Sequence, residues 1–101
     1  MKKESSLQTE VLRWLRLLPH TIWWNNHGTA YSGKGRLDIS GSYRGFFVSI
    51  ELKTEEGKTS GVQDCVIKRI KGTGGFAFVC RSLDEVKAAL EEVKNDKKTT
   101  I

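Results

Sequence analysis

The chain has 101 residues, which fits one domain and leaves little for a second. Hydrophobic residues make up 38% of it and charged residues 29%, a globular composition that excludes disorder throughout the chain. Seventeen Lys and Arg residues against twelve Asp and Glu residues give a net charge of +5, which favours a polyanionic partner without requiring one.

The sequence predicts a cytoplasmic protein that makes no contact with a membrane. No apolar run approaches the roughly 18 residues that a membrane-spanning helix needs. The N-terminal residues also lack the apolar core of a signal peptide. Cys65 and Cys80 are far apart, and neither a CxxC motif nor a histidine cluster accompanies them. We therefore expect two buried, reduced thiols and no zinc site.

The first half of the chain predicts one helix followed by three strands. Apolar residues recur at helical spacing over residues 4–18, and Pro19 ends that pattern. β-Branched and aromatic residues indicate a strand over 21–24, and glycines and asparagines indicate a loop over 25–35. The pattern then predicts a strand opening at 37–39, a hairpin turn over 41–45 and a strand of alternating apolar and polar residues over 46–53.

The second half predicts a helix over 62–71, a strand over 76–80 and a final helix to about Val93. The strand is apolar throughout, so we expect it to be covered on both faces. Ser82 and Glu85 have the spacing of a capping box and start the final helix.

The domain would then span residues 1–93, and residues 94–101 would form a frayed polar tail. The order helix, three strands, helix, strand, helix indicates an α/β fold in which helices flank a mixed sheet.

Charged residues occupy positions where the strand pattern favours apolar ones. Glu51 lies in the middle of the third strand, and Lys53 projects from the same face. Pairing with the preceding strand would bring Asp38 beside Glu51, where two carboxylates repel each other unless a cation lies between them. Carboxylate and carbonyl oxygens are ligands for Mg²⁺ or Mn²⁺. For a Glu-x-Lys motif alone, the alternative is a cross-strand ion pair or a solvated face.

Two further polar residues allow two interpretations each. Glu4 lies within the apolar stripe of the first helix, where it either has a buried partner or complements the helix dipole. Gln63, in the first turn of the second helix, is by itself an ordinary N-terminal polar residue.

Asp38 followed by Glu51-Leu52-Lys53 resembles the D…(D/E)-x-K signature of the PD-(D/E)XK nuclease superfamily. A longer ordered set resembles the virus-type replication-repair nuclease (VRR-NUC) family and covers about residues 4–90: Glu4-x-x-x-Gln8, residues 35–38 and 45–53, Gln63, and residues 74–79. The family usually has a proline before the first aspartate of the motif, whereas this chain has Leu37. The difference affects the geometry of the turn and none of the predicted metal ligands. The resemblance implies a restriction-endonuclease-like αβββαβα core.

The resemblance also implies a metal-dependent DNA endonuclease that hydrolyses phosphodiester bonds. Lys53 would orient the attacking water or stabilise the charge on the phosphate, and Gln63 would support Lys53 or the substrate. The metal would be Mg²⁺ or Mn²⁺, held by Asp38, Glu51, the Leu52 carbonyl and, directly or through water, Glu4.

Branched DNA, such as a four-way (Holliday) junction or a flap, is the substrate that the resemblance implies, together with a phage or prophage origin. We expect a homodimer, because two symmetric sites suit such a substrate and the aromatic pairs 23–24 and 46–47 could supply a buried patch. The alternative is a basic nucleic-acid-binding module that keeps the nuclease fold without catalysis. The intact set of Asp38, Glu51 and Lys53 argues against it, because binding alone needs neither carboxylate.

Overall fold

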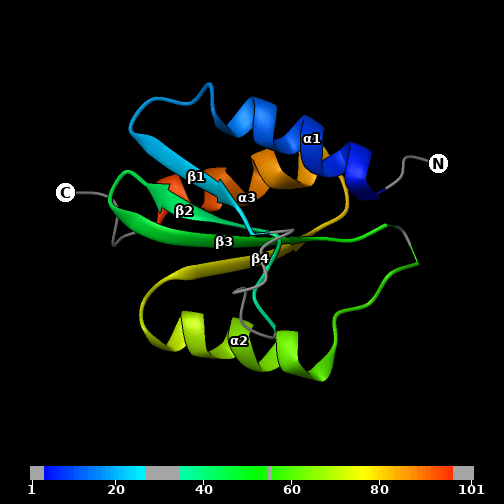
Figure 1. Ribbon diagram of the computed structural model, residues 1–101. Helices are drawn as coiled ribbons and strands as arrows, with labels where there is room; N and C mark the ends of the chain where they lie inside the picture. Colours follow the sequence, from blue (N-terminus) through cyan, green and yellow to red (C-terminus); the bar gives the residue numbers. More distant parts are fainter. Residues whose placement is uncertain (1–3, 27–34, 55, 97–101) are drawn as a thin grey trace.

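The structure is a computed structural model that describes residues 4–26, 35–54 and 56–96, without the side chains of residues 4 and 5. Its elements follow the predicted order, which confirms the fold class (Figure 1). They are α1 (Glu4–Leu15), β1 (Thr21–Asn25), β2 (Ile39–Tyr43), β3 (Phe46–Leu52), α2 (Gly61–Gly72), β4 (Phe76–Cys80) and α3 (Leu83–Asn95).

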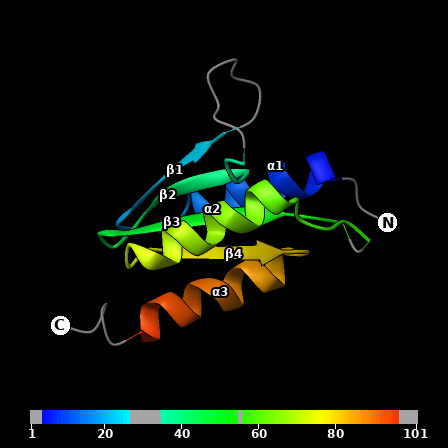
Figure 2. The same ribbon diagram turned by 90° about the horizontal axis from the view of Figure 1, so that it is seen from below.

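The four strands form one mixed sheet in the order β1-β2-β3-β4. β1, β2 and β3 are antiparallel, whereas β4 runs parallel to β3 after the crossover through α2. Helices α1 and α3 cover one face of the sheet, and α2 lies on the other (Figures 1 and 2). The two faces are therefore built differently, and the difference determines where the candidate site lies.

The main core lies between the sheet and the α1–α3 layer. Val48, Ile50 and Leu52 alternate along β3 and are fully buried there, as the period of two predicts. Leu12 is also buried, although the apolar stripe predicted for the first helix consists of Leu7, Val11, Trp14, Leu15 and Leu18. Burying one such side chain contributes about 1.5–3 kcal/mol, so this face anchors β3 firmly.

Helix α1 ends at Leu15, three residues before the predicted end at Leu18. The next residues form tighter turns, in which Leu18 N–H donates to the Leu15 carbonyl. Pro19 disfavours helical backbone at the residue before it, which explains the early end. The Thr21 hydroxyl then donates to the Leu18 carbonyl at 2.9 Å and satisfies one of the free carbonyls.

The β2–β3 hairpin differs from its predicted boundaries. Its turn is Arg44-Gly45 alone, with φ values of 52° and 93°, and β2 occupies 39–43, so residues 41–43 of the predicted turn belong to the strand. Positive φ at both central residues is the geometry of a two-residue hairpin turn. Gly41 is a strand residue opposite Trp23, whose ring lies where a side chain at Gly41 would project.

The helix caps also differ in part from the prediction. Ser60 and Gln63 form a reciprocal capping box at the start of α2, which was not predicted. At the start of α3, Ser82 accepts a hydrogen bond from Glu85 N–H, but the Glu85 carboxylate accepts from Arg81 N–H instead of closing the box. Helix α3 continues to Asn95, beyond the predicted domain end at Val93, and the rest of the predicted tail from residue 97 lies outside the described residues.

Two predictions of burial were wrong. β4 is an edge strand, so Val79 is 36% exposed on the α2 face although Ala77 is buried there. Cys65 is exposed on α2, a helix that has no fully buried residue. Cys80 is buried as predicted, and burial raises the pKa of its thiol to about 12. Among the residues described, no helix is long and apolar enough to cross a membrane.

The close approach at Gly41 generates a stability prediction. A Cβ at Gly41 would lie 2.0 Å from the Ile22 carbonyl oxygen and 2.7 Å from the Trp23 ring. We expect Gly41→Ala to lower the free energy of unfolding by about 3 kcal/mol, measured by urea denaturation. Gly72→Ala is the matched control, because a Cβ there meets nothing within 4 Å. A loss in Gly41→Ala no larger than in Gly72→Ala would contradict the prediction.

Candidate active site

Asp38 and Glu51 meet on the α2 face of the sheet, just before β2 and near the end of β3. The register that pairs Ile39 with Ile50 brings them side by side, as the sequence predicted. Two hydrogen bonds join the segments: Asp38 N–H donates to Glu51 Oε1 at 3.2 Å, and Leu52 N–H donates to Asp38 Oδ2 at 2.8 Å. Asp38 is 5% exposed and Glu51 is 2% exposed. Both carboxylates are therefore inside the protein and held by backbone N–H groups.

Lys53 lies beside this pair, with its Nζ 3.1 Å from Glu51 Oε2. Its backbone N–H donates to the Cys80 carbonyl at 3.1 Å, which continues the β3–β4 pairing past the end of β3. The turn at Gly57 packs on the aliphatic part of Lys53, because a Cβ at Gly57 would lie 3.3 Å from Lys53 Cδ. The ammonium is thus held in place beside Glu51.

Gln63 has the N-terminal role that the sequence offered as one alternative, and it also contacts Glu51. Its side-chain oxygen accepts a hydrogen bond from Ser60 N–H at 3.0 Å, which caps helix α2. Its side chain also hydrogen-bonds Glu51. The cap therefore fixes the orientation of a group that contacts the buried carboxylate.

The pKa of Glu51 is raised above its usual value. Burial is the main cause, and the nearby Asp38 carboxylate adds to it. The hydrogen bond and charge of Lys53 and the hydrogen bond from Gln63 act in the opposite direction without cancelling the effect. The surroundings of Glu51 therefore destabilise its ionised form. Shifted pKa values of this kind are common at functional sites.

The side chain of Glu4 lies outside the described residues, but the start of α1 is linked to the site. One helical turn after Glu4, Gln8 Nε2 donates to Asn25 Oδ1 at 2.7 Å. The next residue, Asn26, donates its backbone N–H to the Asp38 carbonyl at 2.8 Å. The first turn of α1 and the end of β3 lie at the same end of the molecule (Figure 1). Glu4 remains a predicted ligand.

Sequence reasoning missed Asn26, which positions Asp38. Besides its backbone bond to Asp38, Asn26 donates from Nδ2 to the Leu37 carbonyl at 2.8 Å and to Ser40 Oγ at 2.9 Å. These bonds hold the backbone on both sides of the aspartate. The available signal was an asparagine directly after a strand, a residue type whose side chain often bonds nearby backbone groups.

Two carboxylates are the oxygen donors that the described residues offer to a divalent cation at this site. Within the described residues, no group of three or more His, Cys, Asp and Glu side chains could hold a metal. Asp38 and Glu51 nevertheless provide two adjacent carboxylates, and the Leu52 carbonyl lies on the backbone between Glu51 and Lys53. Mg²⁺ keeps several waters and needs only one or two protein carboxylates.

Comparisons of the chain with protein-family models, with curated proteins and with solved structures found no match. The similarity to the VRR-NUC family therefore stays a prediction, and the function proposed below rests on the geometry of the site and the charge of the chain.

The raised pKa of Glu51 predicts how stability depends on pH without metal. A group whose pKa is higher in the folded state binds its proton more tightly there, so its contribution is present below the unfolded pKa and is lost as pH rises through the folded pKa. We expect the Tm in EDTA to fall as the pH is raised from about 4.5 through the folded pKa of Glu51.

Glu51→Gln removes the titrating group and should flatten this part of the pH profile, as thermal denaturation can measure. Glu91→Gln is the control, because Glu91 is exposed on α3. An unchanged profile in Glu51→Gln would contradict the prediction.

Proposed function

We propose that the protein is a DNA endonuclease that needs Mg²⁺ or Mn²⁺ and hydrolyses phosphodiester bonds. The observation that carries this proposal is the burial of Asp38 and Glu51 against each other, with Lys53 beside them. A buried ion pair needs only one carboxylate, and a second one adds repulsion that stability does not explain. A site for a divalent cation explains why both are there.

The side chains have distinct roles in the proposed reaction. Asp38, Glu51 and the Leu52 carbonyl would hold the metal, with Glu4 as a further oxygen donor. A metal at this position lowers the pKa of a water molecule and neutralises charge on the phosphate. Lys53 has an ammonium that is already held in place, so it can orient the attacking water or stabilise negative charge on the phosphate.

The charge of the chain supports DNA as the substrate. The net charge is +5, and α2 presents exposed Lys68, Arg69 and Lys71 on the face of the sheet that carries the site. Such side chains neutralise phosphates and bind DNA without reading its sequence. A module that only binds DNA would use these cations, but it would gain nothing from the two buried carboxylates.

The carboxylates give the most direct test. We expect Asp38→Asn and Glu51→Gln each to abolish cleavage of DNA in Mg²⁺ or Mn²⁺, while binding is kept or strengthened because a negative charge is lost. Mn²⁺ should raise the Tm of the wild type but not of these variants. Gel assays of cleavage and binding measure the first effects, with Glu91→Gln as the active control. Full activity in either variant would overturn the assignment, and a wild type that binds DNA but never cleaves it would support the non-catalytic alternative.

Lys53 can be tested separately from the metal ligands. Lys53→Met keeps the aliphatic contacts but removes the charge, so we expect the cleavage rate to fall by about 10²–10³-fold. The Mn²⁺ concentration that gives half-maximal rate should change little. Lys58→Met, at an exposed position in the following loop, should cleave at the wild-type rate. A wild-type rate in Lys53→Met would show that Lys53 has only a structural role.

Branched DNA and a homodimer are a further part of this proposal. Two sites related by a two-fold axis would place paired nicks in opposing strands of a four-way junction or a flap. We expect cleavage of such substrates to be faster than cleavage of plain duplex. Light scattering tests the dimer on its own, and a mass near the 11.4 kDa of one chain would exclude it.

A further inference from the structure

Among the described helices, α2 alone lies on the face of the sheet that carries the site. It lies over β3 and β4 and not over β1 and β2 (Figure 2). Two large aromatic side chains are exposed on this face: Trp24 is 56% exposed on β1, and Phe47 is 48% exposed on β3. Trp23, the neighbour of Trp24, points to the opposite face and is buried in the core. The core at this point of β1 holds one tryptophan, so a lack of space in the core does not explain why Trp24 is exposed.

A trough lies between these two aromatic side chains. The strand between them carries only Ser40 and Ser42 on this face, paired with Trp24 and Phe47 respectively. Because neighbouring strands are about 4.8 Å apart, β1 and β3 are separated by roughly 10 Å across these small side chains. Three hollows of about 310, 370 and 350 Å³ adjoin Phe47; the second also reaches Trp24, and the third lies between Phe47 and α2.

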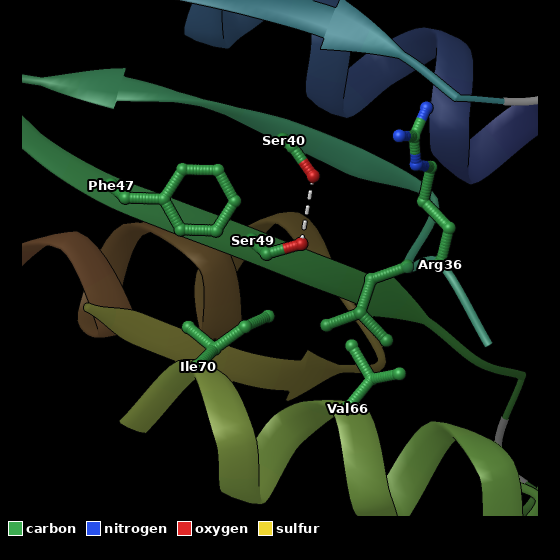
Figure 3. Close-up of a pocket in the computed structure, with 7 residues that line it drawn as sticks. Arg36, Ser40, Phe47, Ser49, Val66 and Ile70 are labelled. Atoms are coloured by element: carbon green, nitrogen blue, oxygen red, sulfur yellow. Dashed lines mark hydrogen bonds between the residues drawn. The ribbon is translucent and has the colours of Figure 1, made fainter. Parts of the chain in front are cut away.

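The trough adjoins the candidate active site. Ser49, which lines the first hollow, lies two residues before Glu51 on the same face of β3. Leu37, in the same hollow, directly precedes Asp38. Figure 3 shows this hollow between the sheet and α2, with Val66 and Ile70 rising from the helix, Phe47 on the sheet, and a hydrogen bond of 2.9 Å joining Ser40 and Ser49.

The chemistry of the lining favours a nucleotide. The charged side chains among the described residues that line the three hollows are Arg36 and Arg69, and no carboxylate lines them. The lining thus combines apolar and aromatic side chains with cations and a few amide and hydroxyl groups. The volumes lie at the lower end of the roughly 300–1,000 Å³ of small-ligand pockets. A ligand with a flat apolar face and an attached negative charge matches this combination.

Duplex DNA and a second copy of the chain match it less well. In a duplex the faces of the bases are stacked on one another, so they cannot reach Trp24 or Phe47. A second copy with its two-fold axis at this trough would bring its own Arg36 and Arg69 near the same cations, and like charges across an interface are unfavourable. We therefore do not assign Trp24 and Phe47 to the buried patch of the proposed homodimer.

We propose that this trough binds an unpaired nucleobase of the DNA strand that enters the active site. The base stacks on Trp24 or Phe47, and Arg36 contacts its phosphate. This inference rests on the proposed nuclease function and narrows its substrate to DNA with unpaired nucleotides beside the scissile phosphate. Stacking on an aromatic side chain does not depend on the identity of the base, so it selects single-stranded structure and not sequence.

Binding in EDTA tests the trough without cleavage. The probes are a fluorescein-labelled oligothymidine of twelve nucleotides and a blunt, fully paired duplex of twelve base pairs, followed by fluorescence anisotropy at fixed salt. We expect the oligothymidine to bind about tenfold or more tightly than the duplex. Trp24→Ala and Phe47→Ala should each weaken oligothymidine binding by about 10- to 100-fold and change duplex binding by less than about twofold. Oligothymidine should also quench tryptophan fluorescence in the wild type and not in Trp24→Ala.

Matched variants separate stacking from misfolding. Trp24→Phe keeps an aromatic face and should restore most of the affinity that Trp24→Ala loses. Leu17→Ala removes another exposed apolar side chain, away from the trough, and should bind as the wild type does. A Tm for Trp24→Ala close to that of the wild type shows that the fold is kept.

The outcomes distinguish this inference from the function on which it rests. The proposal that the trough binds a nucleobase is overturned if the wild type binds the two probes equally, even if it cleaves DNA. It is also overturned if Trp24→Ala and Phe47→Ala bind them as the wild type does. If the variants lose oligothymidine binding but the wild type cleaves no substrate in Mg²⁺ or Mn²⁺, nucleobase binding in the trough is supported and the proposed nuclease function is contradicted. A change from dimer to monomer in Trp24→Ala without a change in DNA affinity would assign the trough to a second copy and overturn the inference.

Discussion

The register between β2 and β3 is the constraint on which the rest of the structure depends. It pairs Ile39 with Ile50, so the residues just outside β2 meet the end of β3, and Asp38 comes to lie beside Glu51. Side chains alternate along a strand, so a slip of one residue would send Glu51 into the apolar core and Ile50 to the other face. The core on one side of β3 and the polar site on the other therefore require the same register.

Holding two carboxylates together inside the protein is unfavourable, and the surrounding residues limit the cost. Backbone N–H groups donate to both carboxylates, the Lys53 ammonium lies against Glu51, and Gln63 adds a hydrogen bond from the start of α2. Asn26 holds the backbone around Asp38. The part of this cost that the surrounding groups do not offset raises the pKa of Glu51. Fixed groups of this kind do not have to reorganise when charge develops nearby, which is what catalysis of phosphodiester hydrolysis requires.

The apolar core and the candidate site lie on opposite faces of the sheet. The α1–α3 face carries the buried apolar residues and anchors each strand. The α2 face has one helix with no fully buried residue, and it leaves room for charged, hydroxyl and aromatic side chains to meet solvent. Successive side chains of a strand point to opposite faces of the sheet. Packing on the α1–α3 face therefore fixes the positions of the side chains on the α2 face, although it does not contact them.

The sequence by itself predicted the order of the elements, because strand alternation and helical periodicity are local properties. It also predicted that Asp38 lies beside Glu51, but the register that brings them together depends on the Arg44-Gly45 turn, which only the structure places. It also singled out Lys53 and Gln63, which the structure places against Glu51. Only the tertiary structure decided the boundaries of the hairpin, because Gly41 is a strand residue on account of Trp23, which is far from it in sequence. The same holds for the role of Asn26, the exposure of Val79 and the trough at Trp24. Each of these depends on which surfaces the neighbouring elements cover, and no local pattern encodes that.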